Sequence, residues 1–297
     1  MEKYKLIQSK TALSKNKQPS KWFGVHYKVN PYRGCSHNCI YCDARSECYQ
    51  LEDFNCIEVK ENLGEIIRKE LRTKRNKGTI GTGGMTDPYM PIERKFRITR
   101  SLLEAIDFYH YPVLLFTKSK LILDDLELLK SINSKSKCSV AITLTTIYDE
   151  VARVTEPGAS TVTERLETIR TLSENGIYVG VTMMPILPFI NDKPDDIKKL
   201  VQAIAFYGGK FIIPYFGVTL RDRQRDYYYK KLDEHYPGLK ETYQKSYGFN
   251  YSCNSRKARE LYYLVKDECK KYGIVSDMKD IITYEKENAL AQIQFPF

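Results

Sequence analysis

The stretch Cys35-Ser36-His37-Asn38-Cys39-Ile40-Tyr41-Cys42 places three thiols at the spacing C-x3-C-x2-C. It follows Asn30-Pro31-Tyr32-Arg33-Gly34, so a glycine precedes the first cysteine and an aromatic residue precedes the last. Cysteine thiolates are the usual protein ligands of iron–sulfur clusters. Because the triplet supplies only three ligands, a cubane cluster held there would leave one iron free to bind another molecule. We therefore predict that Cys35, Cys39 and Cys42 bind a [4Fe-4S] cluster.

Two other interpretations of the triplet are open. A zinc loop would favour C-x2-C pairs and four protein ligands, and three unrelated buried thiols would need no metal at all. The cluster is favoured because the spacing, Gly34 and Tyr41 occur together. We expect His37 to be an ordinary loop residue, and Cys48 and Cys56 to be free thiols.

The composition excludes several classes of protein. The chain has 297 residues, of which 42% are hydrophobic, and this suits one large domain with appendages. No apolar run approaches the roughly 20 residues that a membrane helix needs, and Met1-Glu2-Lys3-Tyr4-Lys5 lacks the apolar block of a secretion signal. Eight cysteines, three of them clustered, fit an intracellular metal site better than a disulfide framework. We expect a soluble cytoplasmic protein without a membrane partner.

The formal net charge of +10 is concentrated in two flanking segments. Residues 1–28 carry seven Lys and one Glu, and residues 221–272 carry thirteen Lys or Arg against eight acids. Basic flanks of this kind can hold nucleic acid through its phosphates. Solvated helix faces in a lysine-rich proteome would give the same charge, so charge alone does not decide between these two explanations.

Between the flanks, apolar strands alternate with amphipathic helices. Strands are expected at residues 22–30, 78–84, 112–117, 138–145, 177–184 and 210–216, and helices at 61–74, 97–108, 123–133, 162–174 and 194–207. Continuously apolar strands are typical of a parallel sheet. We predict an α/β fold, a partial (β/α)6 barrel of TIM type over residues 22–220, with a basic arm at 1–21 and a helical extension at 221–297. Active sites of such barrels lie at the C-terminal ends of the strands, where the cysteine loop falls.

The cysteine motif resembles the signature of the radical S-adenosylmethionine (SAM) superfamily. The wider stretch from Asn30 to Arg45, with the later Thr86-Asp87-Pro88-Tyr89-Met90-Pro91-Ile92-Glu93-Arg94, resembles the spore photoproduct lyase-like proteins in particular. The resemblance implies that SAM binds the open iron and that one electron from a reductant such as flavodoxin or ferredoxin splits it. The resulting 5′-deoxyadenosyl radical would take a hydrogen atom from a substrate.

The resemblance also implies which residues contact SAM. Tyr41 would lie against the adenine, and Gly83, Gly84 and Thr86 would lie near the amino group. Asp87 would bind a ribose hydroxyl or the substrate, or only cap a turn. Lys118 would place a cation at the rim of the pocket.

Later strand ends complete the expected SAM site. Thr143 and Thr145 share one strand face because they are two residues apart; their hydroxyls suit the ribose or carboxylate, although threonine is also common in strands. Arg153 or Arg165 would pair with the SAM carboxylate. Pro185 would form an apolar rim for the adenine, or simply close a buried strand.

The substrate is left open by the sequence. The resembling lyases carry a hydrogen-donating cysteine after the second strand, whereas Gly83-Gly84-Met85-Thr86 contains no thiol. Cys253, at an expected helix start where thiol pKa values fall, or Tyr215 would have to replace it. Basic flanks and Tyr227-Tyr228-Tyr229, which could stack on bases, favour a nucleic acid substrate and DNA repair. The missing thiol favours a peptide or small molecule, and a non-enzymatic iron–sulfur or zinc module is the third possibility.

Overall fold

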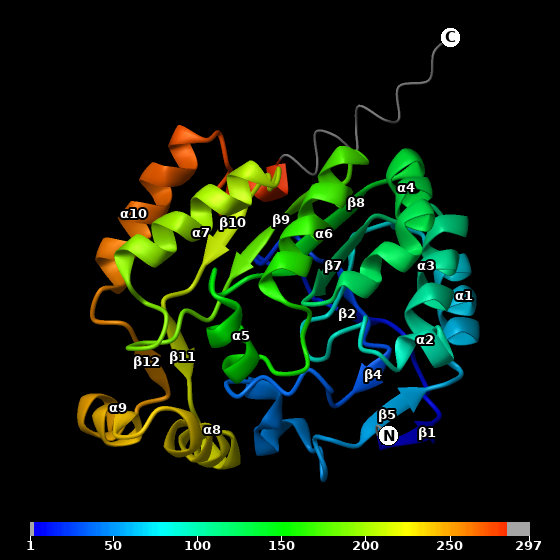
Figure 1. Cartoon of the computed structure of the whole chain (residues 1–297). Coiled ribbons are helices and arrows are strands. Elements are labelled where there is room, and N and C mark those ends of the chain that lie inside the picture. Colours follow the sequence, from blue (N-terminus) through cyan, green and yellow to red (C-terminus); the bar gives the residue numbers. More distant parts are fainter. Residues whose placement is uncertain (1–2, 284–297) are drawn as a thin grey trace.

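A seven-stranded sheet lies at the centre of the computed structural model, which describes residues 3–283 (Figure 1). Its strand order is β10-β9-β8-β7-β6-β3-β2, and every pair is parallel except β2 with β3. The strands are β2 (Ser14–Lys15), β3 (Tyr27–Lys28), β6 (Ile80–Thr82), β7 (Val113–Thr117), β8 (Cys138–Thr143), β9 (Tyr178–Met183) and β10 (Ile212–Pro214). The predicted α/β fold with a parallel sheet is confirmed. The first strand is shorter than expected, because residues 21–24 form a turn.

Helices pack against one face of this sheet (Figure 1). They are α1 (Leu63–Thr73), α2 (Glu93–Phe96), α3 (Ile98–Phe108), α4 (Leu126–Lys135), α5 (Asp149–Thr155), α6 (Val162–Glu174), α7 (Pro194–Phe206) and α10 (Ala258–Lys271), with a 3-10 helix, η3 (Lys120–Asp125), before α4. Alternate strand residues such as Val113 and Leu115 join Leu102 and Ile106 of α3 in the main core. This is the pattern expected where strand side chains alternate between two faces.

The other face of the sheet is packed at one end and lines a cavity at the other. Leu114 and Ala141 join Phe23 and Phe211 in a separate core cluster. Two residues further along the same strands, Phe116 and Thr143 line a cavity instead. The strands therefore close the interior at their N-terminal ends and leave it open at their C-terminal ends.

The first residues of the chain are more regular than expected. Tyr4–Ile7 forms β1, which pairs in parallel with β5 (Ile57–Lys60), and β5 pairs with β4 (Tyr32–Arg33). Part of the expected basic arm is thus a strand, which the sequence did not indicate because the backbone partner of β1 lies about fifty residues away and leaves no local pattern. The boundary at residue 21 stays a prediction.

The C-terminal extension contains helices and a short ribbon. Its helices are α8 (Asp222–His235), α9 (Leu239–Tyr247) and α10, and β12 (Ser252–Asn254) pairs antiparallel with β11 (Gly217–Thr219). Among residues 3–283, no helix is long and apolar enough to cross a membrane. The expected extension ends at residue 297, so its last part, 284–297, lies outside the described residues.

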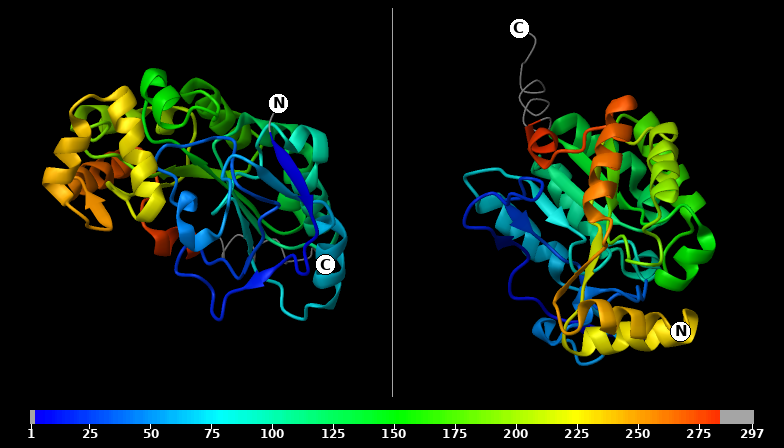
Figure 2. Two further views of the ribbon diagram at one scale, coloured as in Figure 1. Left: turned by 90° about the horizontal axis from the view of Figure 1, so that it is seen from below. Right: turned by 90° about the vertical axis from the view of Figure 1, so that its left-hand side faces the viewer.

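Helix α8 is fixed to the segment that follows the cysteines, which forms the 3-10 helices η1 (Asp43–Arg45) and η2 (Glu47–Tyr49) (Figure 2). Arg223 donates to the carbonyl oxygens of Arg45 and Leu51 at 2.7 and 2.6 Å. Arg221 pairs with Asp43 at 2.6 Å. These arginines at the start of α8 therefore anchor the extension and do not form an outward basic surface.

The tyrosine cluster of α8 also faces inward. Tyr228 and Tyr229 are buried in a core cluster with Cys39 and Ile40 of the cysteine loop. The ring of Tyr227 lies 3.7 Å from the Arg45 guanidinium. The expectation that these rings are exposed for stacking on bases is wrong for Tyr228 and Tyr229, because the docking of α8 on the loop makes them part of the core, while Tyr227 is half-buried against Arg45.

Candidate active site

The three cysteines of the motif line one cavity of about 110 Å³, together with Gly84 and Lys118. All three are free thiols, and Cys35 and Cys39 are buried. Burial raises the pKa of each thiol, so metal binding there would release protons. In the described chain no group of three His, Cys, Asp or Glu converges on the position of a single metal ion. A cluster is larger than an ion, and three thiols around a cavity fit it.

The cysteine loop is held in shape by Arg45. Asn38, inside the loop, has a left-handed backbone with φ of 55°, and its side-chain oxygen accepts a hydrogen bond from Arg45. The Arg45 guanidinium lies between the rings of Phe54, at 4.0 Å, and Tyr227. A buried cation thus supports the loop that carries the thiols.

The glycine-rich turn after β6 forms the opposite wall. Gly83 has φ of +93°, and a Cβ there would lie 2.2 Å from the Phe116 carbonyl oxygen, so only glycine fits. A Cβ on Gly84 would meet nothing within 4 Å, although Gly84 lines the cavity. The Thr86 hydroxyl donates to the Gly34 carbonyl oxygen at 2.6 Å and so joins this turn to the cysteine loop.

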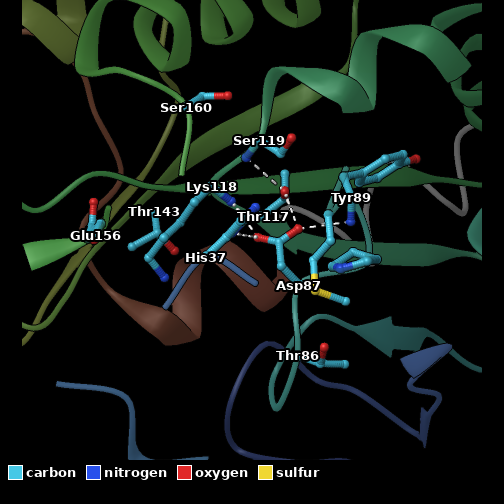
Figure 3. A network of polar contacts seen from close by, with 12 residues as sticks. His37, Thr86, Asp87, Tyr89, Thr117, Lys118, Ser119, Thr143, Glu156 and Ser160 are labelled. Carbon is cyan, nitrogen blue, oxygen red and sulfur yellow. Dashed lines mark hydrogen bonds and ion pairs between the residues drawn. The ribbon is translucent and has the colours of Figure 1, made fainter. Parts of the chain in front are cut away.

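Asp87 is the centre of a polar network (Figure 3). Its carboxylate accepts hydrogen bonds from the Thr117 hydroxyl and the amides of Lys118 and Tyr89, at 2.7, 2.8 and 2.9 Å. It also lies 3.3 Å from Nδ1 of His37. Burial alone would raise the Asp87 pKa, but His37 and these hydrogen bonds lower it to about 2. The structure thus shows Asp87 capping a turn, and His37 paired with it.

Tyr41 is positioned by a buried ion pair. Its hydroxyl donates to Glu156, and Arg165 pairs with Glu156 at 2.6 Å. Burial raises the pKa of Glu156, but Arg165 and Lys118 together lower it below the usual value. Arg165 is 1% exposed and also donates to the Thr143 carbonyl oxygen at 2.9 Å. It therefore supports the site through Glu156 and is not among the residues that line the cavity, and its contact with SAM stays a prediction.

Lys118 is the cation that faces the cavity. Its ammonium lies 5.8 Å from the centre of the Tyr41 ring, and within residues 3–283 it makes no recorded hydrogen bond or ion pair. Burial lowers the pKa of the Lys118 ammonium, but Cys39, Glu156 and Asp87 raise it by more than burial lowers it. The net shift is upward, so the ammonium stays charged. A free cation beside the thiols suits an anionic ligand group.

A second cavity of about 450 Å³ adjoins the first and shares Gly83, Gly84, Met85, Lys118 and Thr143 with it. Ligand sites of small molecules commonly have volumes of about 300–1,000 Å³. The buried hydroxyl of Thr82 lines this cavity and has no hydrogen-bond partner among the described residues 3–283. Thr143 bonds across the strands to Thr182 at 3.0 Å, on the cavity wall. The thiols thus open onto a space large enough for a ligand.

Several residues predicted to contact SAM are not among those that line the two cavities. Thr145 bonds to Glu156 at 3.4 Å and does not line either cavity. Arg153 is exposed on α5, and Pro185 is half-buried outside both linings. Thr145 and Pro185 lie just after β8 and β9, whereas Arg153 lies within α5.

Neither proposed hydrogen donor reaches the cavities. Cys253 lies in β12, not at a helix start, and burial raises its pKa to about 11 where a lowered value was expected. The Tyr215 hydroxyl bonds to Asn254 at 3.2 Å. Both residues belong to the β11–β12 region outside the linings of the two cavities.

Some residues of the site were missed. Glu156 was not considered, although it directly follows α5 and precedes Pro157-Gly158, where a turn could have drawn attention to it. A Cβ on Gly158 would meet the Ser36 carbonyl oxygen at 2.2 Å, so this turn packs on the cysteine loop. Trp22, Lys28 and Thr182, which line the larger cavity, were also missed.

Comparison with known proteins identifies the class. Residues 29–204 match the profile of the Radical SAM superfamily. An uncharacterized protein of Mycobacterium tuberculosis is 31% identical over 229 residues, 74% of this chain and 67% of that protein. An uncharacterized protein of Methanocaldococcus jannaschii is 32% identical over 197 residues, which is 65% of this chain and 73% of that protein. The chain belongs to the radical SAM superfamily.

Two further matches are to proteins with named activities, one by structure and one by sequence. A spore photoproduct lyase structure has a TM-score of 0.68 at 19% identity, covering 92% of this chain and 81% of that one. A radical SAM Nalpha-GlyT isomerase of Pseudomonas phage M6 is 28% identical over 189 residues, 63% of this chain and 38% of that protein. The first likeness shows a shared fold.

Membership of the superfamily confirms the predicted cofactors and excludes the non-enzymatic module. The protein is a radical SAM enzyme that uses a [4Fe-4S] cluster and SAM. The thiol donor set, the space beside Gly84 and the free ammonium of Lys118 fit these groups.

Proposed function

We propose that SAM binds across the boundary between the two cavities, with Cys35, Cys39 and Cys42 holding the cluster. The supporting observation is that Gly83, Gly84, Lys118 and Thr143 line both the thiol cavity and the larger one. The bound cofactors would supply a 5′-deoxyadenosyl radical that removes a hydrogen atom from a substrate. The six parallel strands would form the predicted partial (β/α)6 barrel around this space.

The residues of the chain would bind, orient and shield. The Lys118 ammonium would hold the SAM carboxylate as a charged hydrogen-bond donor. Gly84 would let the backbone approach the ligand closely, since its Cβ position is empty. Glu156 and Arg165 would fix Tyr41 in orientation, and the Phe23 and Phe211 cluster would exclude water from the far end.

We propose that the substrate is part of a nucleic acid and that the reaction resembles a lyase reaction in DNA repair. Trp22, 43% exposed, and Lys28 lie on the wall of the larger cavity, where they could contact a base and a phosphate. No carboxylate is among the residues that line this cavity. A related fold occurs in a spore photoproduct lyase complexed with dinucleoside spore photoproduct. A cytoplasmic flavodoxin or ferredoxin would be the reductant.

A peptide or small molecule is the second proposal. It is favoured because the arginines and Tyr228 and Tyr229 of α8 face inward, and because Cys253 and Tyr215 lie away from the cavities. The experiment is deuterium transfer from a single-stranded oligonucleotide labelled in its thymine methyl groups and, separately, at its sugar carbons. Deuterium in 5′-deoxyadenosine supports the nucleic acid substrate. Formation of 5′-deoxyadenosine without deuterium from any labelled position favours the second proposal.

A further inference from the structure

A third cavity of about 300 Å³ lies behind the glycine-rich turn. Its lining comes from the segment before the cysteines, the segment after them, and β5. The residues are Asn30, Tyr32, Arg33, Gly34, Ala44, Cys48, Tyr49, Leu51, Lys60, Met85 and Thr86. We call this cavity the Lys60 lobe.

The charges of the Lys60 lobe are of one sign. Arg33 and Lys60 line it, and no Asp or Glu does. The Arg33 guanidinium is already engaged, because it pairs with Glu58 at 2.9 Å and donates to the carbonyl oxygens of Tyr49 and Gln50 at 3.1 Å. The positive charge available to a ligand therefore comes from Lys60.

Lys60 has unused capacity to bind an anion. Its ammonium has three N–H donors, and one of them donates to the Asn30 carbonyl oxygen at 2.8 Å. Lys60 makes no ion pair within residues 3–283, and Glu58, the carboxylate that acts on its pKa, already pairs with Lys5 and Arg33. Burial followed by repulsion from Arg33 lowers the Lys60 pKa. A half-buried cation without a counterion is stabilised by an oxyanion.

The Lys60 lobe shares lining residues with the two cavities of the active site. Met85 lines all three of them. Asn30 lines the lobe and the 450 Å³ cavity, and no side-chain hydrogen bond of Asn30 is recorded in the described chain. This shared wall would place the lobe beside a ligand in the larger cavity.

We propose that the Lys60 lobe binds an oxyanion group of the substrate, a phosphate or a carboxylate, with Lys60 and the Asn30 amide as donors. This inference rests on the proposed function and adds a chemical requirement, since the substrate must carry an anion a short distance from the hydrogen that is removed. A nucleotide would supply a phosphate and a peptide would supply a carboxylate.

Cys48 provides a reporter inside the lobe. It is an exposed free thiol on the lobe wall, whereas Cys56, also free, is not part of the lining. The cluster-loaded protein is alkylated anaerobically with iodoacetate or with iodoacetamide, and each cysteine is followed by peptide mass spectrometry. The two reagents differ mainly in the carboxylate. For each cysteine, the alkylation rate with iodoacetate is divided by the rate with iodoacetamide. The value of this ratio at Cys48, divided by its value at Cys56, therefore measures the attraction of an oxyanion into the lobe.

We expect this normalised ratio to favour iodoacetate by at least about threefold, and to fall to near unity in Lys60→Met. Lys60→Arg should retain the preference, which separates charge from disturbed packing. Inorganic phosphate and acetate are then added as competitors to the wild type. Stronger slowing at Cys48 by phosphate points to a phosphate-bearing substrate, and stronger slowing by acetate points to a carboxylate.

The inference is overturned if the ratio is the same in wild type and Lys60→Met and neither competitor slows alkylation of Cys48. This result is independent of radical chemistry, because no SAM cleavage is needed. Failure of the lobe can thus be told from failure of the proposed function, which is measured by 5′-deoxyadenosine.

Discussion

The Thr86 hydroxyl donates a 2.6 Å hydrogen bond to the Gly34 carbonyl oxygen. Gly34 immediately precedes Cys35, and Thr86 ends the glycine-rich turn that lines both principal cavities. Gly34 is itself fixed, because it has φ of +76° and a Cβ there would lie 2.8 Å from the Phe54 carbonyl oxygen. The walls that would hold the cluster and SAM are therefore joined by one buried hydrogen bond.

Replacing Thr86 tests this connection. Thr86→Val keeps the shape but leaves the Gly34 carbonyl oxygen without its donor, so we expect a loss of about 1–3 kcal/mol in the free energy of unfolding. Thr86→Ser keeps the hydroxyl and should stay within about 1 kcal/mol of the wild type. Urea denaturation of the three proteins provides the comparison. An equal loss of unfolding free energy in Thr86→Val and Thr86→Ser would show that the loss does not come from the hydrogen bond.

The two neighbouring glycines should respond differently to a side chain. Gly84→Val places atoms in open cavity space, so the protein should fold with near-normal stability and bind SAM at least about tenfold more weakly, or ~1.4 kcal/mol. Gly83→Ala forces a Cβ against the Phe116 carbonyl oxygen at a positive φ, and should cost about 1–3 kcal/mol of stability. Calorimetric SAM titration and thermal unfolding distinguish the two effects. Normal SAM affinity in Gly84→Val would place SAM elsewhere.

Breaking the buried ion pair should be costly. Glu156→Gln leaves Arg165 charged and unpaired in the core, which we expect to reduce stability by about 3–5 kcal/mol. The double variant Glu156→Leu with Arg165→Met removes both charges and should recover most of this loss. A double variant no more stable than Glu156→Gln would mean that the charge pair is not the source of the effect.

The same pair predicts a dependence on pH. Burial raises the pKa of Glu156, but Arg165 and Lys118 outweigh it, so the folded pKa lies below the usual 4.5. The carboxylate therefore contributes its full stability above pH 4.5, and this is lost as the pH falls through the folded pKa. The stability gap between wild type and Glu156→Gln should be constant near neutral pH and narrow below about pH 4.5. A gap that widens in acid would contradict this sign.

Arg45 should control loading of the cluster. Arg45→Met removes the donor to Asn38 and the cation between Phe54 and Tyr227, so we expect a less ordered cysteine loop and less iron per chain after reconstitution. Arg45→Lys keeps the charge but not the planar stack, so its iron content should lie between those of the wild type and Arg45→Met. Iron and sulfide analysis with circular dichroism separates loss of the cluster from loss of the fold. Full loading of Arg45→Met would show that the loop needs no such support.

Periodicity predicted the parallel sheet because each strand is a local run with a clear pattern. Leu114 and Phe116 alternate with Val113 and Leu115, and the same alternation recurs in the next strands. The cysteine motif likewise lies within eight consecutive residues. Such local signals account for the confirmed fold class, family and cofactors.

Non-local contacts explain what the sequence could not predict. Cys253 reads as a helix start, but backbone pairing with Val218 makes it part of a strand. Arg165 follows the right strand, yet its orientation depends on Glu156, which no spacing rule connects to it. Tyr228 was expected to stack on a base, but the docking of α8 on the cysteine loop buries it. In each case the deciding partner is distant in sequence or was not recognised.

The most direct test of the account is SAM cleavage by the full-length protein, reconstituted anaerobically to about four iron and four sulfide per chain. With dithionite and SAM, the wild type and a Cys56→Ala control should form 5′-deoxyadenosine, and Cys35→Ala, Cys39→Ala and Cys42→Ala should form none. A fully loaded wild type that forms no 5′-deoxyadenosine, or triplet variants as active as the wild type, would contradict it.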